Sequence, residues 1–476
     1  MKLHEEAARC LLCHDAPCTA VCAKGDPARA VRAIRFGNTE IAGRWLADCS
    51  DQDLERAEAA CIHYDRPIRL REIAAALPAP QAVAQPSLEI DFCGIRCENP
   101  FFLASSAVCT NYEMVARAFE AGWAGVFYKT ICLQEIREVS PRFDAVGKPF
   151  AGFRNMEQLS ENPVEVDFEY LSRLKKNYPS KIVVASIMGQ SEEDWIKLAK
   201  MAEEAGCDAV ELNFSCPQMR ESGMGSDVGQ DPELVTFFTA YVKRNVSIPV
   251  LAKMTPNIAH ISQPAMGAYF AGADAISAIN TIKSVTLGDG SEVSGFQTGS
   301  GYSGRAVKPI ALRHILAMAK NPMMKNIEFS GIGGIETWRD ALEFIQLGCA
   351  NVQVCTAVME YGYRIIDDMI AGLQNYMAVR GVSSLSELVG ERLPFFKLPS
   401  DLDRETVVYP LFDKNKCIGC GRCVISCADG GHQALEFDAE ARRPRLLGAK
   451  CVGCHLCRLV CPADAIGLSK RVPKRK

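Results

Sequence analysis

Two cysteine runs near the carboxyl end constrain the fold of this chain more than any other feature. Both have the spacing C-x2-C-x2-C-x3-C, and Pro462 follows the second. Thiolates two residues apart can hold adjacent corners of an iron–sulfur cluster, while the fourth cysteine of each run reaches the other cluster. Zinc ribbons or a disulfide framework are the alternatives, and this paired spacing fits both poorly. We therefore predict two 4Fe–4S clusters, one held by Cys417, Cys420, Cys423 and Cys461, the other by Cys451, Cys454, Cys457 and Cys427.

The cysteine content also bears on the compartment. Twenty-two cysteines would suggest a disulfide scaffold in a small secreted chain, but this chain has 476 residues. Its first residues lack an apolar signal core, and no apolar run approaches the ~18 residues that span a bilayer. The formal net charge of −4 comes without a sustained basic stripe, which argues against nucleic acid or an anionic membrane as a partner. We expect a reducing cytoplasm and no membrane.

Composition divides the chain into parts. Residues 1–74 form a cysteine-bearing, mostly helical head, and the prolines within residues 75–86 mark a linker. Residues 87–395 form the body. Residues 396–469 form a ferredoxin-like unit, and residues 470–476 form a basic, solvated tail.

The body alternates short apolar runs with longer amphipathic stretches such as residues 192–205 and 363–377. Eight strands in about 310 residues, most followed by a helical pattern, predict a (β/α)8 TIM barrel. A doubly wound open sheet is the alternative. The predicted strands are residues 101–106, 125–130, 181–188, 209–214, 249–254, 275–280, 327–332 and 351–356.

Polar residues recur at the carboxyl ends of these strands, which is where a barrel builds its active site. Each alone is unremarkable, because lysines and asparagines often end strands as solvated residues, but their joint recurrence favours the barrel and a function. They are Ser105, Lys129 with Thr130, Asn213, Lys253, Asn280 and Gly333.

Two glycine clusters could bind phosphate. Residues 299–304 fit G-x-G-x-x-G, but no hydrophobic strand precedes them, so we reject a dinucleotide site and expect a flexible loop that covers the substrate. Gly331, Gly333 and Gly334 follow the seventh predicted strand and precede a helix expected near Glu336. Glycines there let backbone amides meet a phosphate, such as that of a flavin mononucleotide, although a tight turn is the alternative.

Cys216 is the predicted reactive residue. It directly follows the fourth predicted strand, between Asn213 and a glycine-rich segment at residues 223–229 able to close over a ligand. A thiol with an unperturbed pKa of about 8.5 is mostly protonated at neutral pH and can donate a proton. Isolated cysteines are usually small buried hydrophobes, and we expect this of Cys93, Cys97, Cys109, Cys132, Cys207 and Cys349.

Several segments resemble a known family. Residues 213–217, 252–257, 278–281 and 301–312, with the eight-cysteine tail, are similar to dihydropyrimidine dehydrogenases, specifically the catalytic subunit of the bacterial NAD-dependent form. The resemblance covers roughly residues 87–465. It implies an FMN-containing barrel related to dihydroorotate dehydrogenases that acts on uracil and thymine.

The resemblance also implies roles for individual residues. Reduced flavin would deliver hydride from N5 to C6 of the pyrimidine, Cys216 would protonate C5, and Lys129 and Lys253 would stabilise the reduced ring. The implied FMN contacts are Ser105, Lys129, Thr130, Lys253, Ser303, Gly304, Gly333, Gly334, Cys355 and Thr356. Asn155, Glu157, Asn213, Asn280 and Thr281 would hold the pyrimidine, whose carbonyls and N–H groups pair with such side chains.

The head resembles the amino-terminal iron–sulfur segment of the long single-chain dihydropyrimidine dehydrogenases. By that resemblance, Cys10, Cys13, Cys18 and Cys61 would hold one further 4Fe–4S cluster. Cys22 would belong to a second cluster, but only Cys49 remains nearby to accompany it. We expect one cluster in the head, with a zinc site or a degenerate structural head as the alternative.

No segment offers a credible Rossmann fingerprint for NAD or FAD. We therefore expect a flavoprotein partner subunit that carries NAD and FAD, hence a hetero-oligomer. A dihydroorotate dehydrogenase-like or other FMN-dependent ene-reductase is the alternative enzyme. An electron-transfer adaptor is the non-enzymatic alternative.

Overall fold

The computed structural model describes residues 2–78, 85–146, 151–217, 219, 223–286 and 298–474. The chain forms two compact units, Met1–Leu393 and Pro394–Lys476. The first unit combines the head with the barrel. Within the described ranges, no helix is both long and apolar enough to cross a membrane.

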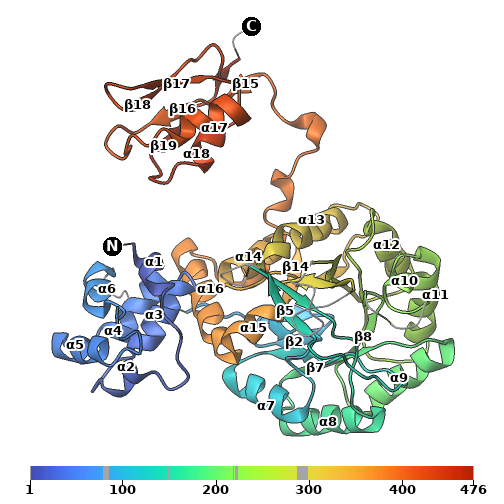
Figure 1. The fold of residues 1–476 in the computed structure, drawn as a ribbon. Helices are drawn as coiled ribbons and strands as arrows, with labels where there is room; N and C mark the ends of the chain where they lie inside the picture. Colours follow the sequence, from blue (N-terminus) through green and yellow to red (C-terminus); the bar gives the residue numbers. More distant parts are fainter. Residues whose placement is uncertain are drawn as a thin grey trace. The chain divides into compact units, whose positions relative to one another are not determined.

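Eight parallel strands close into a barrel in the first unit (Figure 1). Closure confirms the predicted TIM barrel and rules out the open sheet. All eight predicted strands are present, with bounds that differ by a few residues. In order around the barrel, the strands are β10 (Ala275–Ala278), β13 (Glu328–Ile332), β14 (Cys349–Val354), β3 (Phe101–Leu103), β4 (Gly125–Phe127), β7 (Ile182–Ile187), β8 (Ala209–Asn213) and β9 (Val250–Lys253).

The sequence of these strands suits a position buried on both faces. All six residues of β7, Ile-Val-Val-Ala-Ser-Ile, are buried. β-Branched and small apolar side chains pack well on a pleated surface that is covered on both sides. The chain enters the barrel through a hairpin of β1 (Ile90–Phe92) and β2 (Ile95–Cys97).

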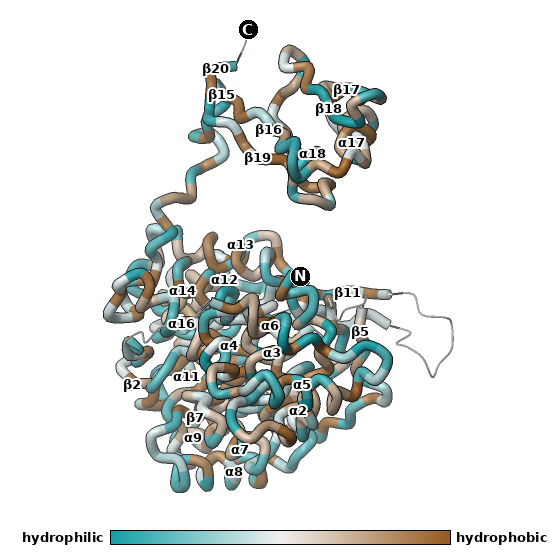
Figure 2. Tube along the Cα trace, turned by 90° about the vertical axis from the view of Figure 1, so that its left-hand side faces the viewer, coloured by the Kyte–Doolittle hydropathy of each residue, from teal (hydrophilic) through white to brown (hydrophobic). Residues whose placement is uncertain are grey.

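Amphipathic helices surround the barrel (Figure 1), and hydrophilic and hydrophobic segments alternate along helices such as α9 and α11 (Figure 2). A capping box starts α9: Ser191 Oγ accepts from Asp194 N at 3.3 Å and Asp194 accepts from Ser191 N. The helices are α7 (Tyr112–Ala121), α8 (Val164–Asn177), α9 (Glu192–Glu204), α10 (Ser226–Gly229), α11 (Pro232–Lys243), α12 (Ser262–Phe270), α13 (Lys308–Ala319), α14 (Trp338–Gln346), α15 (Thr356–Tyr361) and α16 (Ile366–Arg380). Short 3-10 helices lie at Arg305–Val307, Tyr363–Ile365, Leu385–Glu387, Leu393–Phe395 and Pro399–Asp401.

A second, antiparallel sheet has the order β11-β12-β6-β5. Its strands are β5 (Phe143–Val146), β6 (Gly152–Asn155), β11 (Ile282–Ser284) and β12 (Ser300–Ser303). The expectation of a flexible loop at residues 299–304 was therefore wrong, because β12 pairs with both β6 and β11. Residues 287–297, which precede this segment, lie outside the described residues. β12 is antiparallel to its neighbours, whereas the dinucleotide-binding motif requires a strand of a parallel βαβ unit.

The head is helical, as predicted. Its helices are α1 (Leu3–Ala7), α2 (Pro17–Ala20), α3 (Pro27–Arg35), α4 (Thr39–Leu46), α5 (Asp51–Ala59) and α6 (Leu70–Ala76). Asp26 caps α3 by accepting from Arg29 N at 3.0 Å, and Pro27 fills the first helical position. A small core that includes Val31, Ile34 and Leu54 holds the helices together.

The second unit consists of short paired strands and two helices that carry cysteines. β15 (Thr406–Val407) pairs with β20 (Val472–Pro473), β16 (Pro410–Phe412) with β19 (Ile466–Leu468), and β17 (Leu435–Asp438) with β18 (Arg443–Leu446). α17 spans Arg422–Gly430 and α18 spans Leu456–Leu459.

Candidate active site

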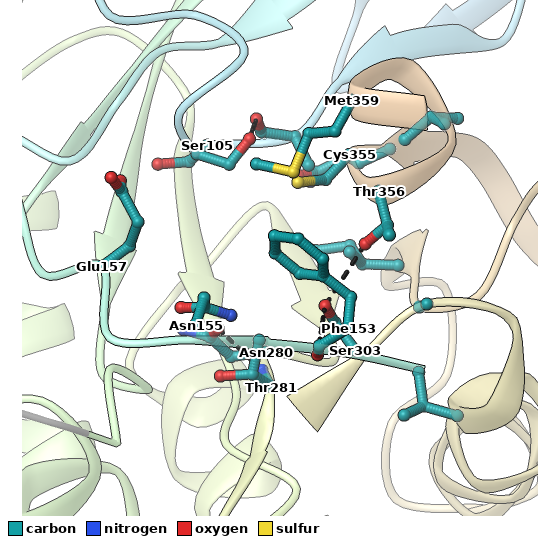
Figure 3. Close-up of a pocket in the computed structure, with 18 of the residues that line it drawn as sticks. Ser105, Phe153, Asn155, Glu157, Asn280, Thr281, Ser303, Cys355, Thr356 and Met359 are labelled. Carbon is teal, nitrogen blue, oxygen red and sulfur yellow. Dashed lines mark hydrogen bonds between the residues drawn. The ribbon is translucent and has the colours of Figure 1, made fainter. Parts of the chain in front are cut away.

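One pocket lies at the carboxyl ends of the barrel strands, and the β12–β6 sheet contributes to its wall. Every site residue predicted for the barrel lines this pocket, and Figure 3 shows part of the set. They are Ser105, Lys129, Thr130, Asn155, Glu157, Asn213, Cys216, Lys253, Asn280, Thr281, Ser303, Gly304, Gly333, Gly334, Cys355 and Thr356. The space, including its open mouth, is about 1160 Å³.

Thr130 is the centre of a hydrogen-bond network that joins four barrel strands. Its Oγ1 accepts from Asn213 Nδ2 at 2.9 Å and also bonds to Ser105 Oγ at 3.0 Å and Ser186 Oγ at 2.9 Å. These partners come from the ends of β3 and β8 and from within β7. Thr130, Ser186 and Asn213 are all buried. The network therefore fixes the floor of the pocket.

A chain of amides and hydroxyls continues from Asn213 to Thr281. Ser215 Oγ donates to Asn213 Oδ1 at 2.6 Å and accepts from Asn280 Nδ2 at 2.9 Å. Asn280 Oδ1 accepts from Thr281 N at 2.7 Å. In Figure 3, Asn155, Asn280 and Thr281 lie together on one side of the pocket. This side carries amide and hydroxyl groups suited to the edge of a polar ring.

Glycine at position 301 lets this polar side come together. A Cβ at Gly301 would lie 2.5 Å from Thr281 Oγ1 and 3.3 Å from Asn155 Nδ2. Any side chain there would push β12 away from the two residues. The G-x-G-x-x-G segment is thus built for close approach of side chains across the sheet.

Both predicted lysines are buried and face a carboxylate. Lys129 Nζ pairs with Glu157, which Arg142 Nε also contacts at 3.2 Å. Lys253 Nζ lies 3.4 Å from Glu211 Oε1 at the base of the pocket. Buried charges are usually paired with an opposite charge, and each of these lysines has a carboxylate partner.

Cys216 is almost completely buried, with an exposed fraction of 5%, yet it lines the pocket. It follows the end of β8 by three residues, and its carbonyl accepts from Ser226 N at 2.9 Å, at the start of α10. The glycine-rich segment expected to flank it is thus partly helical. Its thiol is placed where a ligand in the pocket can meet it.

Glycine-rich backbone and hydroxyls form the opposite end of the pocket. Gly334 has φ +73°, and a Cβ there would lie 2.7 Å from Lys308 N, so a larger residue would displace the start of α13. Ser303 Oγ bonds to Thr356 Oγ1 at 3.2 Å (Figure 3). Thr337 caps α14, which begins at Trp338, two residues later than expected. Backbone amides and hydroxyls of this kind can hold a phosphate.

The pocket fits an FMN. Its two ends differ in chemistry: buried lysines and an asparagine lie at one, glycine backbone and hydroxyls at the other. Gln353 also lines the pocket, and its buried Oε1 has no hydrogen-bond partner within the described part of the chain. A cofactor with a polar ring edge and a phosphate matches both ends.

Several lining residues were missed from the sequence. Phe153 and Tyr302 lie on β6 and β12, and Arg305 and Glu336 lie near the glycine end. A signal for Phe153 existed, because residues two apart on a strand share a face and Asn155 had already been assigned. Arg305 and Glu336 lie next to or two residues after the assigned Gly304 and Gly334, whereas Tyr302 reaches the pocket through a sheet pairing that the sequence did not reveal.

The second unit gathers its cysteines in the two predicted sets. One cavity is lined by Cys417, Cys420, Cys423 and Cys461, and another by Cys427, Cys451, Cys454 and Cys457. Backbone amides already donate to two of these sulfurs: Ala434 N to Cys427 at 3.3 Å and Ala465 N to Cys461 at 3.4 Å. Such N–H···S bonds stabilise the thiolates that hold a cluster.

The head brings its four predicted ligands together as well. Cys10, Cys13, Cys18 and Cys61 line one cavity with apolar walls that include Val31. Burial raises the pKa of the Cys18 thiol to about 11. Cys22 and Cys49 lie outside this cavity, and their thiols donate to the carbonyls of Cys18 and Lys24, each at 3.3 Å.

The cysteines expected as buried hydrophobes behave mostly as such. Cys93 is only half-buried. Burial raises the pKa of Cys109 to about 12 and that of Cys132 to about 11, so these thiols stay neutral. The fully or largely buried members are Cys97, Cys109, Cys132, Cys207 and Cys349.

Comparison with known proteins places the two units in families. The family described as dihydroorotate dehydrogenase matches residues 87–377, and the 4Fe-4S dicluster domain matches residues 411–468. The chain is 51% identical over 392 residues to the NAD-dependent dihydropyrimidine dehydrogenase subunit PreA of Escherichia coli, covering 80% of this chain and 95% of the relative.

More distant relatives share the barrel. The chain is 39% identical over 345 residues to the chloroplastic dihydropyrimidine dehydrogenase (NADP(+)) of Arabidopsis thaliana, covering 67% of this chain and 80% of the relative. It is 36% identical over 305 residues to the catalytic subunit of dihydroorotate dehydrogenase B (NAD(+)) of Pyrococcus abyssi, covering 64% of this chain and 98% of the relative. The chain therefore belongs to the family of NAD-dependent dihydropyrimidine dehydrogenase subunits, oxidoreductases that combine a dihydroorotate dehydrogenase-type barrel with a 4Fe–4S dicluster domain.

Proposed function

We propose that this chain reduces the 5,6 double bond of uracil and thymine to the 5,6-dihydropyrimidine, and catalyses the reverse reaction. The supporting observation is the single pocket in which a buried thiol, two buried lysines and a row of amides meet. A bound FMN would supply the hydride. The chain's own residues would bind the flavin and the pyrimidine, place positive charge beside the flavin ring and donate the proton.

Ten residues of the pocket are proposed to hold FMN. Lys129 and Lys253 carry positive charge that stabilises negative charge on the reduced ring. Ser303, Thr356 and the glycine backbone would bind the phosphate. The full set is Ser105, Lys129, Thr130, Lys253, Ser303, Gly304, Gly333, Gly334, Cys355 and Thr356.

The pyrimidine would bind against the amide side of the pocket, on Asn155, Glu157, Asn213, Asn280 and Thr281. Amides can both donate to the carbonyls and accept from the N–H groups of uracil. The hydrogen bonds that run from Asn213 through Ser215 to Asn280 hold these amides in fixed orientations before a ligand arrives. A ring without matching groups would leave buried amides unpaired, which provides specificity.

Cys216 would hold the proton that goes to C5 and take it back in the reverse direction. Its burial keeps bulk water away from the thiol, so the proton goes to the ligand rather than to solvent.

Electrons would reach the flavin through 4Fe–4S clusters from a partner subunit that carries FAD and binds NAD. Two clusters would lie in the second unit and one in the head, on the cysteine sets described above. A cluster spreads its ligands around a body several ångströms wide, whereas a zinc ion draws four sulfurs to about 2.3 Å from one point. Cysteines that line a cavity favour the cluster. The assembly would be a hetero-oligomer in the cytoplasm.

The test uses the purified chain under anaerobic conditions. With an artificial low-potential electron donor it should reduce uracil, and with NADH alone it should not. NADH-driven turnover should appear when the flavoprotein partner is added. Alanine at Cys423 or Cys457 should impair this coupled activity more than turnover with the artificial donor.

Other outcomes would identify the alternatives. Turnover of orotate in place of uracil would identify a dihydroorotate dehydrogenase. Absence of stoichiometric FMN would identify an electron-transfer adaptor. NADH-driven turnover by the isolated chain would contradict the need for a partner.

A further inference from the structure

The head is attached to the barrel by ion pairs, one of which is buried. Arg32 Nε lies 2.6 Å from Asp368 Oδ2, and both side chains are buried. Arg29 Nη2 lies 2.7 Å from Asp367, and Asn38 Nδ2 donates to the Asp368 carbonyl at 2.8 Å. These contacts place α3 of the head beside α16 of the barrel (Figure 1). Head and barrel belong to one compact unit.

The barrel also holds the loop that carries two of the head cysteines. Arg364, which follows α15, donates to the carbonyls of Cys13 at 3.2 Å and Leu12 at 2.6 Å. Arg35 of α3 donates to the Cys10 carbonyl at 3.1 Å. Two arginines therefore donate to three carbonyls around the four-cysteine cavity, those of Cys10, Leu12 and Cys13.

The same Arg35 leads from this loop to the pocket. Its Nη2 donates to Tyr361 Oη at 3.4 Å, and its guanidinium lies 5.1 Å from the centre of the Tyr361 ring. Tyr361 Oη donates to Glu336 Oε1 at 2.8 Å, and Glu336 lines the flavin pocket. Two side chains thus bridge a cysteine carbonyl and the pocket wall.

The helix α15 extends from the pocket to the contact with the head. The helix begins at Thr356, which lines the pocket, and ends at Tyr361, which contacts the head. Six residues at ~1.5 Å each span about 9 Å. Met359 and Glu360 of the same helix also line the pocket. Along this path, α15 and the Arg35 side chain lie between the flavin pocket and the four-cysteine site.

The other side of the four-cysteine site is open. Leu11, between two of the cysteines, is 59% exposed, and Tyr64, three residues after Cys61, is 83% exposed. An electron donor can therefore approach the site from solvent while its opposite side faces the barrel.

We propose that the head is an electron inlet of its own: electrons enter at the Cys10, Cys13, Cys18 and Cys61 site and pass along Arg35, Tyr361 and Glu336 to the flavin pocket, without passing through the second unit. The inlet rests on the proposed function, because it requires the head cluster and FMN. Each reduced cluster yields one electron, so two successive transfers from the donor and one proton from solvent reduce one FMN to the anionic FMNH⁻. The reductant is a one-electron protein donor of the ferredoxin class.

The test measures flavin reduction rather than turnover. In the full chain, Cys420→Ala and Cys454→Ala together remove one ligand from each cluster of the second unit. Reduced ferredoxin, too large to enter the pocket, is mixed anaerobically with this variant without pyrimidine, and the loss of flavin absorbance is followed. The flavin should still be reduced, and adding Cys13→Ala should abolish this reduction.

A second comparison tests the route itself and requires only mild substitutions. Tyr361→Phe keeps the ring, whose centre lies 5.1 Å from that of Phe36, and removes the hydroxyl between Arg35 and Glu336. It should slow flavin reduction through the head at unchanged iron content. Tyr376→Phe is the matched control, because that hydroxyl bonds to Gln346 and Arg380 and not to the head. Equal rates for the two Phe variants would overturn the route.

Iron analysis separates this inference from the proposed function. The variant that lacks the clusters of the second unit should retain about four iron atoms per chain, those of one 4Fe–4S cluster. Four iron atoms with a flavin that stays oxidised would overturn the inlet and leave the proposed function intact. No iron would overturn the head cluster and the inlet with it.

Discussion

Thr130→Val tests whether the hydrogen-bond network at the pocket floor stabilises the barrel. The change keeps the shape of the side chain but removes the hydroxyl that bonds to Ser105, Ser186 and Asn213. Ser186 is fully buried and Asn213 is 4% exposed, so both depend on protein partners for their hydrogen bonds. An unsatisfied buried polar group costs about 1–3 kcal/mol. Ser186 keeps its hydrogen bond to Glu211, so the cost falls mainly on the other two partners. We therefore expect the free energy of unfolding to fall by about 2–4 kcal/mol in total.

Thr239→Val in α11 is the matched control. Thr239 is equally buried, but its hydroxyl has no hydrogen-bond partner within the described part of the chain. Removing it should leave stability unchanged or raise it by up to about 1 kcal/mol. Because the protein has more than one unit, amide hydrogen exchange in β4 and β8 is the assay, which reports the opening free energy of the barrel alone. Equal losses in the two variants would refute the network as a source of stability.

Three further predictions concern the site and the attachment of the head. Cys216→Ala should retain FMN and all clusters yet lose most pyrimidine reduction, and full turnover would refute its role as proton donor. Asn280→Ala should weaken uracil binding by roughly 1–3 kcal/mol, measured by titration of the flavin absorbance, and unchanged binding would move the pyrimidine elsewhere. Burial raises the pKa of Asp368 to about 6. The folded chain therefore holds a proton that the unfolded chain releases near pH 4, and stability from this group is lost as pH rises towards and through 6. Relative to Asp368→Asn, the wild type should lose about 1 kcal/mol between pH 5 and 7 by hydrogen exchange in the head, and a constant difference would contradict this.

Much of the architecture was predictable because its signals are local. The strands of the barrel are short apolar runs whose periodicity does not depend on distant residues, and all eight appear where they were expected. Polar residues at strand ends had to converge once the strands were parallel, which is why Ser105, Lys129 and Asn213 line one pocket. The cysteine spacing restricts ligand geometry directly along the chain. The two sets of cysteine ligands in the second unit could therefore be assigned from the sequence.

Other features depend on contacts between distant segments. The β12 strand was mistaken for a flexible loop, because its polar, glycine-rich sequence lacks strand character and β6, nearly 150 residues earlier, supplies its pairing. The same pairing brings Tyr302 and Phe153 to the pocket. The ion pair of Lys129 with Glu157 was equally hidden, since each residue had been assigned separately to a ligand.

The sequence by itself determined the barrel, the two cysteine sets of the second unit and the polar residues at the strand ends, because periodicity and spacing act within one segment. Only the tertiary structure decided how the head meets the barrel. Arg32 and Asp368 are 336 residues apart, and nothing in either segment marks its partner. Their contact, and the line from Arg35 through Tyr361 to the pocket, exist because two separately folded surfaces carry complementary charge in the same place.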